Sequence, residues 1–223
     1  LTQWGSEGTA NGQFEYPAGI AVSSRGNIYV ADYGTNRIQK FYMSSSSLGS
    51  VIGIFRPSTG TWYLDYTNDG TADKTVKFGT NGDTAVVGDW NNAGHSEIGV
   101  FRNSTGTWYL DYNFDGRVDK QVTFGKSGDI PVVGNWSSVG HTGIGVFRPS
   151  TGTWYLDYNF DGTVDKLVTL GQKGDLPVVG DWNGDGISEI GVFRPSTGTW
   201  YLDYNFDGTV DKLVTLGQKG DLP

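Results

Sequence analysis

The chain has no cysteine and only two histidines among its 223 residues. The lack of cysteine excludes a disulfide framework and any thiolate metal site, and it leaves the redox compartment open. No apolar run approaches the roughly 20 residues that a membrane-spanning helix needs. Basic side chains are also scarce, with 16 Lys and Arg against 24 Asp and Glu. A surface of net charge −8 would repel nucleic acid and suits a divalent cation or a basic partner.

Glycine and aromatic residues are abundant instead. The chain contains 35 Gly, 8 Trp, 12 Tyr and 11 Phe, a composition typical of many short strands joined by tight turns. The length fits one all-β domain or two small ones. Because the chain begins at Leu1 and not at Met, we expect a mature product or a fragment.

A repeat of 46 residues runs through most of the chain. It is marked by two series of tryptophans, Trp62, Trp108, Trp154 and Trp200, and Trp90, Trp136 and Trp182. Residues 144–177 and 190–223 are identical, which indicates recent duplication. A period of this size predicts a propeller blade or a solenoid coil. Within one repeat we expect four strands, at 178–182, 190–194, 199–204 and 212–216, and four short strands favour a blade.

We therefore predict an all-β fold, a β-propeller of four-stranded antiparallel blades. Alternation along 199–204 puts Trp200, Leu202 and Tyr204 on one face of their strand. Tryptophans in such company are expected to pack between blades. The alternative is that the series beginning at Trp62 forms a platform on which sugar rings stack.

Residues 1–42 contain a different pattern. It consists of Gly-Gln-Phe at 12–14, Pro-Ala-Gly-Ile-Ala-Val at 17–22, Tyr-Val-Ala-Asp at 29–32 and Asn-Arg-Ile-Gln-Lys-Phe at 36–41. This segment resembles an NHL repeat, and the resemblance implies a four-stranded propeller blade. Without the resemblance, three short β runs are still expected between turns of Gly, Ser and Asn. Residues 43–51 form a Ser-rich connector.

Residues 52–223 resemble FG-GAP repeats of the VCBS type, which occur in extracellular proteins. The resemblance depends on the segment 178–202, which reads Val-Val-Gly-Asp-Trp-Asn-Gly-Asp-Gly-Ile-Ser-Glu-Ile-Gly-Val-Phe-Arg-Pro-Ser-Thr-Gly-Thr-Trp-Tyr-Leu. The units are 52–97, 98–143, 144–189 and the incomplete 190–223, which with residues 1–42 gives about five blades.

The FG-GAP resemblance also implies a calcium loop between the first two strands of a blade. The loop residues here are Asp181, Asn183, Asp185 and Glu189. In the first copy of this loop Ala93 replaces the central carboxylate, although Asp89, Asn91 and Glu97 remain. The second copy, with Asn135, Ser137, Val139 and Gly143, has no carboxylate for a dication. We expect a metal at the last copy alone.

A second acidic loop occurs in every repeat, between the third and fourth strands. Oxygen-bearing side chains at its first, third, fifth and ninth places, with Gly sixth, have the spacing of a calcium loop. The alternative is an Asp-Gly hairpin turn that is acidic only because it is solvated. The candidate ligands are Asp65, Asp69 and Asp73; Asp111, Asn113, Asp115 and Asp119; Asp157, Asn159, Asp161 and Asp165; and Asp203, Asn205, Asp207 and Asp211.

Several other residues stand out. Phe114, Phe160 and Phe206 lie in the middle of these acidic loops. Either they form a contact surface for a glycan, a neighbouring subunit or the next blade, or each folds back over its own hairpin. Four arginines, each in a Phe-Arg-x-Ser-Thr-Gly turn, could bind an anion but are expected to pair with a loop carboxylate or a backbone carbonyl. They are Arg56, Arg102, Arg148 and Arg194.

Three functional hypotheses follow. The leading one is a non-enzymatic, Ca²⁺-stabilised binding or adhesion module, extracellular or at the cell surface, whose ligand is a glycan or a cell-surface protein. The second is a self-associating subunit of a surface layer or filament, which near-identical repeats permit. The third is a metal-dependent hydrolase or lyase, because some NHL-type propellers are such enzymes. It requires His or carboxylates converging on the axis, whereas His95 and His141 fall in loops.

Overall fold

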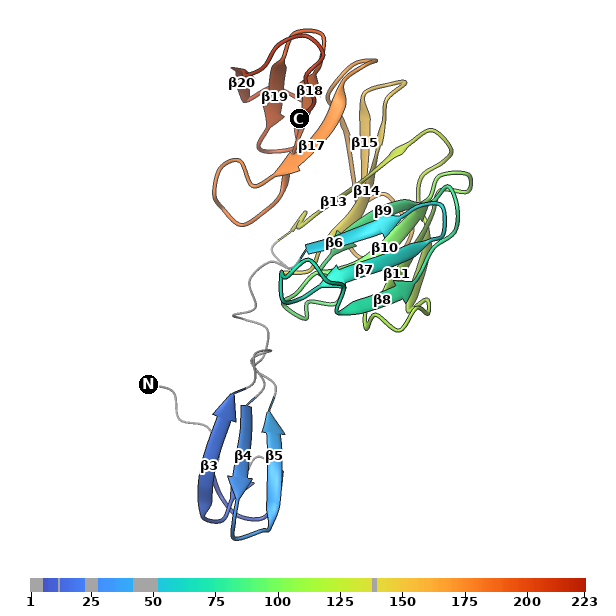
Figure 1. Ribbon diagram of the computed structural model, residues 1–223. Helices are drawn as coiled ribbons and strands as arrows, with labels where there is room; N and C mark the ends of the chain where they lie inside the picture. Colours follow the sequence, from blue (N-terminus) through green and yellow to red (C-terminus); the bar gives the residue numbers. More distant parts are fainter. Residues whose placement is uncertain (1–5, 12, 23–27, 42–51, 138–139) are drawn as a thin grey trace. The chain divides into compact units, whose positions relative to one another are not determined.

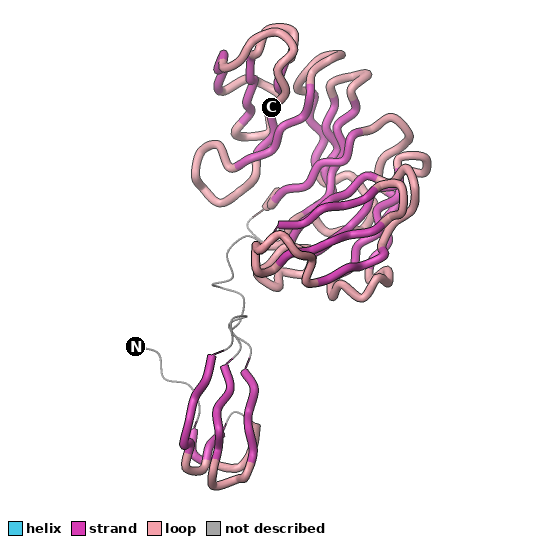
Figure 2. Tube along the Cα trace, in the orientation of Figure 1, coloured by secondary structure: helices cyan, strands magenta, loops and turns pink. Residues whose placement is uncertain are grey.

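The computed structural model describes residues 6–11, 13–22, 28–41, 52–137 and 140–223. Strands and loops make up all of this part of the chain (Figure 2), so the expected all-β class is confirmed. No described segment forms a helix long and apolar enough to cross a membrane. The chain divides into two compact units, one containing the described residues within 1–52 and 65–71, the other residues 53–64 and 72–223.

The first unit contains a three-stranded antiparallel sheet, as the three β runs in the sequence predicted. Its buried anchor is Asp32, whose carboxylate accepts hydrogen bonds from the N–H of Glu15 at 2.8 Å and from Arg37. The predicted connector at 43–51 lies outside the described residues. The strands of this unit are β1 (Ser6–Glu7), β2 (Gln13–Phe14), β3 (Pro17–Val22), β4 (Ile28–Asp32) and β5 (Arg37–Phe41).

The 46-residue repeats form four successive antiparallel sheets, the last three of them four-stranded (Figure 1). The blade-like sheets that the sequence predicted are thus confirmed, while the number of five blades stays a prediction. The strands are β6 (Ile52–Arg56), β7 (Thr61–Asp65), β8 (Lys74–Lys77); β9 (Thr84–Gly88), β10 (Glu97–Arg102), β11 (Thr107–Asp111), β12 (Lys120–Thr123); β13 (Ile130–Gly134), β14 (Gly143–Arg148), β15 (Thr153–Asp157), β16 (Lys166–Thr169); β17 (Leu176–Gly180), β18 (Glu189–Arg194), β19 (Thr199–Asp203) and β20 (Lys212–Thr215).

The first strand of the last sheet begins and ends two residues earlier than the sequence suggested. Leu176 and Pro177 pair with Phe193 and Val192, and so extend β17 towards its N-terminus. After Gly180 the backbone leaves the sheet, because Asp181 turns its side chain onto the N–H groups of the following loop. The acidic loop therefore starts directly at the end of a strand.

The hydrophobic core lies between successive sheets. Trp108 and Trp154 are fully buried, and their indole N–H groups donate to the carbonyls of Phe124 at 2.9 Å and Leu170 at 3.1 Å. Each sheet also contributes an apolar pair to the cluster of the sheet before it, such as Ile144 in the cluster around Trp108. Buried in this way, these tryptophans have no face free for stacking on a sugar.

The first strands of adjoining sheets also meet. β13 contacts β9 on one side and β17 on the other. The inner strands of propeller blades have this arrangement, because blades converge on a shared axis. In unit 2 the order β17-β18-β19-β20 then places the fourth strand furthest from the inner one.

In each of the three four-stranded sheets, an arginine at the end of the second strand forms an ion pair with an aspartate that precedes the first strand. Arg148, at the end of β14, forms two hydrogen bonds of 2.9 Å with the buried Asp129, which directly precedes β13. The guanidinium also lies 4.3 Å from the ring centre of Tyr155 and donates to its hydroxyl. Arg102, Arg148 and Arg194 thus each have a loop carboxylate as their partner. Arg56 instead donates to the hydroxyl of Tyr63.

Candidate metal centre

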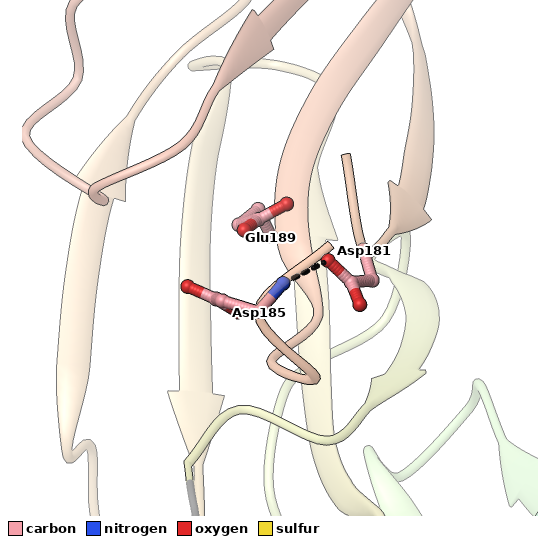
Figure 3. A group of neighbouring side chains, drawn as sticks. All are labelled: Asp181, Asp185 and Glu189. Atoms are coloured by element: carbon pink, nitrogen blue, oxygen red, sulfur yellow. Dashed lines mark hydrogen bonds between the residues drawn. The ribbon is translucent and has the colours of Figure 1, made fainter. Parts of the chain in front are cut away.

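Three carboxylates gather in the loop that joins β17 to β18. One oxygen each from Asp181, Asp185 and Glu189 lies within 4.8 Å of the other two (Figure 3). Asp181 follows the last residue of β17 and Glu189 is the first residue of β18, so the rigid sheet holds both ends of the site. Among the described residues this is the one group of three acidic, His or Cys side chains that meets this distance.

The backbone of the loop is wound around the side chain of Asp181. Its two carboxylate oxygens accept hydrogen bonds from the N–H groups of Gly184 at 2.6 Å, Asp185 at 3.1 Å and Gly186 at 2.9 Å. Gly186 has φ +86°, a left-handed conformation that glycine adopts without strain. Asn183 and Asp185 in turn accept from N–H groups two residues further on. The sequence therefore folds a tight loop whose acidic side chains turn inward.

Glu189 is buried, with 1% of its surface exposed. Its Oε2 accepts a hydrogen bond of 2.6 Å from the N–H of Trp182, whereas its Oε1, also buried, has no partner among the described residues. Burial raises the pKa of Glu189 above its ordinary value of 4.5; the Trp182 N–H offsets part of that effect, and the charges of Asp185 and Asp181 add to it. A buried carboxylate with an unpaired oxygen is expensive unless a cation balances it.

The donor set suits a hard divalent cation. The loop presents carboxylate oxygens and the amide oxygen of Asn183, and Ca²⁺ prefers six to eight oxygen ligands. No described Lys or Arg forms an ion pair with the three carboxylates. The unpartnered Oε1 of Glu189 is the atom that a bound cation would satisfy.

The earlier copies of this loop have fewer oxygen ligands. In the first copy Asp89 accepts bonds from the N–H groups of Ala93 and Gly94, and Glu97 repeats the burial and the unpartnered Oε1 of Glu189. Ala93, however, offers no oxygen from its side chain. In the second copy Gly143 replaces the glutamate, so no carboxylate remains.

The loops between the third and fourth strands have the same backbone pattern. Asp157 accepts bonds from the N–H groups of Asn159, Phe160 and Gly162, and Asp165 accepts one from Tyr158 at 2.6 Å. The two loops differ at the ninth place, where Asp165 is exposed and Glu189 is buried. In the described 157–165 loop no three carboxylates come as close together as those of the 181–189 loop, although Asp157 is fully buried.

The acidic groups of the 157–165 loop have shifted pKa values, and the copies of this loop repeat its backbone hydrogen bonds. Burial raises the pKa of Asp157, and the charge of Asp161 adds to the shift. The hydrogen bonds from Thr163 lower the pKa of Asp161. Asp111, Asp203 and Asp65 likewise accept backbone N–H groups within their own loops. Sites at Asp111, Asn113, Asp115 and Asp119, at Asp203, Asn205, Asp207 and Asp211, and at Asp65, Asp69 and Asp73 stay predictions.

The loop phenylalanines pack against the preceding sheet. Phe160 belongs to the cluster around Trp108, lies edge-on to Trp90 at 6.4 Å between ring centres, and contacts His141 at 5.4 Å. Phe114 and Phe206 occupy the equivalent places one sheet earlier and one sheet later. All three have φ between 59° and 61°, a conformation rare for bulky residues. Their side chains fill the space between successive sheets. A role for these phenylalanines in contacting a ligand stays a prediction.

One link to the loop was not apparent from the sequence. Asn135, at the end of β13, and Ser188 exchange two backbone-directed hydrogen bonds, of 2.7 and 3.0 Å. The amide of Asn135 also donates to the carbonyl of Gly186 at 2.8 Å. Thr142 and Asp89 form the equivalent pair one sheet earlier. The signal available in the sequence was the hydroxyl that recurs at the eighth place of each loop, Ser96, Thr142 and Ser188.

Comparison with known protein families confirms the NHL repeat that the sequence predicted near the N-terminal end of the chain. Residues 14–41 match the family described as NHL repeat. An NHL repeat is therefore present at its N-terminal end. No curated protein matches the chain. The resemblance of residues 52–223 to FG-GAP repeats stays a prediction.

Three solved structures have distant similarity to this chain. Glutaminyl cyclase from Myxococcus xanthus is 10% identical, with a TM-score of 0.47 over 85% of this chain and 66% of that one. BBS1N, crystallised in complex with ARL6DN, is 13% identical, with a TM-score of 0.44 over 92% and 53%. A protein of unknown function from Bacteroides caccae is 13% identical, with a TM-score of 0.45 over 85% and 69%. The chain thus spans about two thirds and about half of the first two, and similarity this low assigns no function.

Proposed function

We propose that this chain is a calcium-stabilised, non-enzymatic binding module that works outside the cell, with FG-GAP-like repeats after its NHL repeat. The observation that carries the proposal is the group Asp181, Asp185 and Glu189, in which a buried glutamate oxygen has no protein partner. The resemblance of residues 52–223 to FG-GAP repeats, which occur in extracellular proteins, is the reason for placing the protein outside the cell.

The position of the loop suggests what the ion does. Asn135 ties the loop to the neighbouring sheet through Gly186 and Ser188. An ion that stiffens residues 181–189 would therefore also stiffen the junction of two sheets. We propose that calcium rigidifies the repeat array, and that the array displays its loops to a glycan or a cell-surface protein.

Calorimetric titration with Ca²⁺ tests the metal site. We expect saturable binding, with a rise in the melting temperature that a chelator reverses. Asp185→Asn should remove the site of the 181–189 loop, whereas Asp221→Asn, which makes the same change in charge on an exposed residue outside any acidic loop, should leave it intact. Asp161→Asn and Asp207→Asn, applied in turn, would count any ions bound in the second series of loops. Equal binding by the wild type and Asp185→Asn would remove the basis of the proposal.

The binding role needs a separate experiment. A glycan array probed in calcium and in chelator should show calcium-dependent retention of one class of glycan if sugars are the ligand. Equal retention of glycans in calcium and in chelator would show that glycan binding does not depend on the metal site.

A further inference from the structure

The chain contains the dipeptide Asn-Gly at 11–12, 81–82 and 183–184. Asparagine before glycine is chemically labile, because the glycine nitrogen can attack the side-chain amide carbon and glycine has no Cβ to hinder the approach. Gly12 lies outside the described residues, so the structure compares the other two dipeptides. Both are followed by Asp, and they differ in their surroundings.

Asn81 and Gly82 lie exposed in the turn that joins β8 to β9. No described residue forms a hydrogen bond with the side chain of Asn81 or with the N–H of Gly82. Gly82 has φ +90°, and a Cβ built on it would meet no atom within 4 Å. Both reacting groups of this dipeptide are therefore free in the folded protein.

Asn183 and Gly184, in the acidic loop, have partners for the same groups. The N–H of Gly184 donates to Asp181 at 2.6 Å, and the Oδ1 of Asn183 accepts from the N–H of Asp185 at 2.8 Å. The Nδ2 of Asn183 also donates to the carboxylate of Asp185 at 3.1 Å. A charge-assisted bond to a carboxylate opposes loss of the Gly184 proton. The loop therefore hinders both the deprotonation and the side-chain movement that the reaction needs.

The next repeat shows why the N–H of Gly82 lacks a partner. There the same turn contains Ser127 and Gly128, and the N–H of Gly128 donates to the side chain of Asn103 at 3.0 Å. The residue equivalent to Asn103 in the first repeat is Pro57, whose side chain has no acceptor. The labile dipeptide and the missing acceptor thus coincide in one turn.

We propose that Asn81 is a site of spontaneous deamidation in the folded protein, and that the acidic loop protects Asn183 from the same reaction. The backbone nitrogen of Gly82 forms a bond to Cγ of Asn81, the bond from Cγ to Nδ2 breaks, and the departing amide takes up the Gly82 proton and leaves as ammonia. Water then opens the resulting succinimide at either carbonyl, which yields aspartate or isoaspartate.

The modified turn is part of a clamp between two sheets. The N–H and the hydroxyl of Thr80 both donate to Asp83, and Arg102 donates to each of them. Isoaspartate lengthens the backbone between Thr80 and Asp83 by a carbon atom, so this set of bonds cannot keep its geometry. β8 belongs to one sheet and β9 to the next. Deamidation therefore loosens the junction of these sheets as the protein ages.

Peptide mapping by mass spectrometry tests the proposal on the full chain, incubated at mildly alkaline pH in chelator so that no bound cation contributes to the protection of Asn183. The peptide containing Asn81 should lose its amide several-fold faster than the peptide containing Asn183, and isoaspartyl methyltransferase should label it. In urea the two rates should become similar. Equal rates in the folded protein would overturn the proposal, and so would a difference that persists in urea, because local sequence and not the fold would then set the rates.

Two variants copied from the next repeat complete the test. Asn81→Ser, which reproduces Ser127, should abolish the modification of this turn and keep its melting temperature during incubation, while that of the wild type falls. Pro57→Asn, which reproduces Asn103, should slow the deamidation of Asn81 several-fold. A rate unchanged by Pro57→Asn would overturn the role of the free Gly82 N–H. A wild type that loses no more thermal stability than Asn81→Ser would overturn the loosening of the junction. Circular dichroism before incubation verifies that each variant is folded.

Discussion

Asn135 and Ser188 exchange two hydrogen bonds across the junction of two sheets. The N–H of Asn135 donates to the Ser188 hydroxyl at 3.0 Å, and the N–H of Ser188 donates to the Asn135 carbonyl at 2.7 Å. Ser188 precedes Glu189 in the candidate calcium loop, so the metal site and the sheet junction share one residue pair. Thr142 and Asp89 repeat the pair at a junction whose following loop has no carboxylates.

Ser188→Ala should lower the free energy of unfolding by about 1–3 kcal/mol, because it leaves the N–H of Asn135 without an acceptor. It should also weaken calcium binding several-fold, since the loop loses an anchor. Thr142→Ala should cost similar stability without changing calcium affinity. Urea denaturation with and without Ca²⁺ measures both effects, and an equal loss of calcium affinity in the two variants would disprove the coupling.

Glu189→Asp should weaken calcium binding by a factor on the order of ten, or about 1.4 kcal/mol. The shorter side chain should move the carboxylate away from Asp181 and Asp185. The converse change, Asp165→Glu, should tighten binding at the 157–165 loop. Calcium titration of both variants tests the role of side-chain length; binding by Glu189→Asp that matches the wild type would contradict it.

Phe160 is 8% exposed and adopts φ 61°, so its packing has to outweigh backbone strain. Phe160→Ala should lower the free energy of unfolding by about 3 kcal/mol, because it opens a cavity beside Trp90. Phe160→Asn loses the same packing but tolerates the left-handed conformation, which Asn68 adopts in the first copy with φ 56°. It should therefore be more stable than the Ala variant by roughly 1 kcal/mol. Thermal denaturation of the Phe160→Ala and Phe160→Asn variants measures the difference. Equal melting temperatures of the two variants would show that the backbone at this position is not strained.

Arg148→Lys should destabilise the fold by about 1–3 kcal/mol, because lysine cannot reproduce the paired bonds to Asp129 or the stacking on Tyr155. Arg56→Lys is the control, since Arg56 is exposed and its guanidinium donates to the hydroxyl of Tyr63 and not to a carboxylate among the described residues. It should change stability by less than about 0.5 kcal/mol. Equal losses in the two variants would show that the ion pair with Asp129 adds nothing.

The free energy of unfolding should depend on pH through two buried carboxyl groups, Glu97 and Asp83. Burial raises the pKa of Glu97 above 4.5, and the N–H of Trp90 offsets only some of that effect. The folded state therefore binds the proton more tightly than the unfolded state, so stability in chelator should fall as the pH rises from 4.5 through the raised pKa. Glu97→Gln should reduce this slope. A slope identical to that of the wild type would exclude Glu97 as its source.

Asp83 should act in the opposite sense at lower pH. Burial tends to raise its pKa, but the hydrogen bonds from Arg102 and the N–H of Thr80 outweigh burial and bring the pKa below 3.8. Its stabilising contribution is present above pH 3.8 and is lost as the pH falls through the lowered pKa. Asp83→Asn should make the acid limb of the stability curve shallower in urea denaturation. An unchanged acid limb would count against the Asp83–Arg102 pair.

The sequence alone determined the repeating part of the fold. A strict 46-residue period, with Trp and Leu alternating at 200 and 202, determined the strands of the three four-stranded sheets and the face that is buried. The acidic loop at 181–189 could also be found, because oxygen side chains at alternate places are a local pattern. Strand ends were less certain, since β17 gains Leu176 and Pro177 only through pairing with β18.

What only the tertiary structure decided concerns residues far apart in the chain. Two loops of nearly the same sequence pattern differ in whether three carboxylates meet, and the carboxylate at the ninth place is buried at Glu189 but exposed at Asp165. The place of Phe160 depends on a cluster built by the preceding sheet, and Asn135 reaches a loop more than 50 residues away. Identical sequences at Leu170 and Leu216 are buried in one sheet and exposed in the next. Local pattern fixes a residue's conformation, whereas burial and partners depend on which neighbour is packed against it.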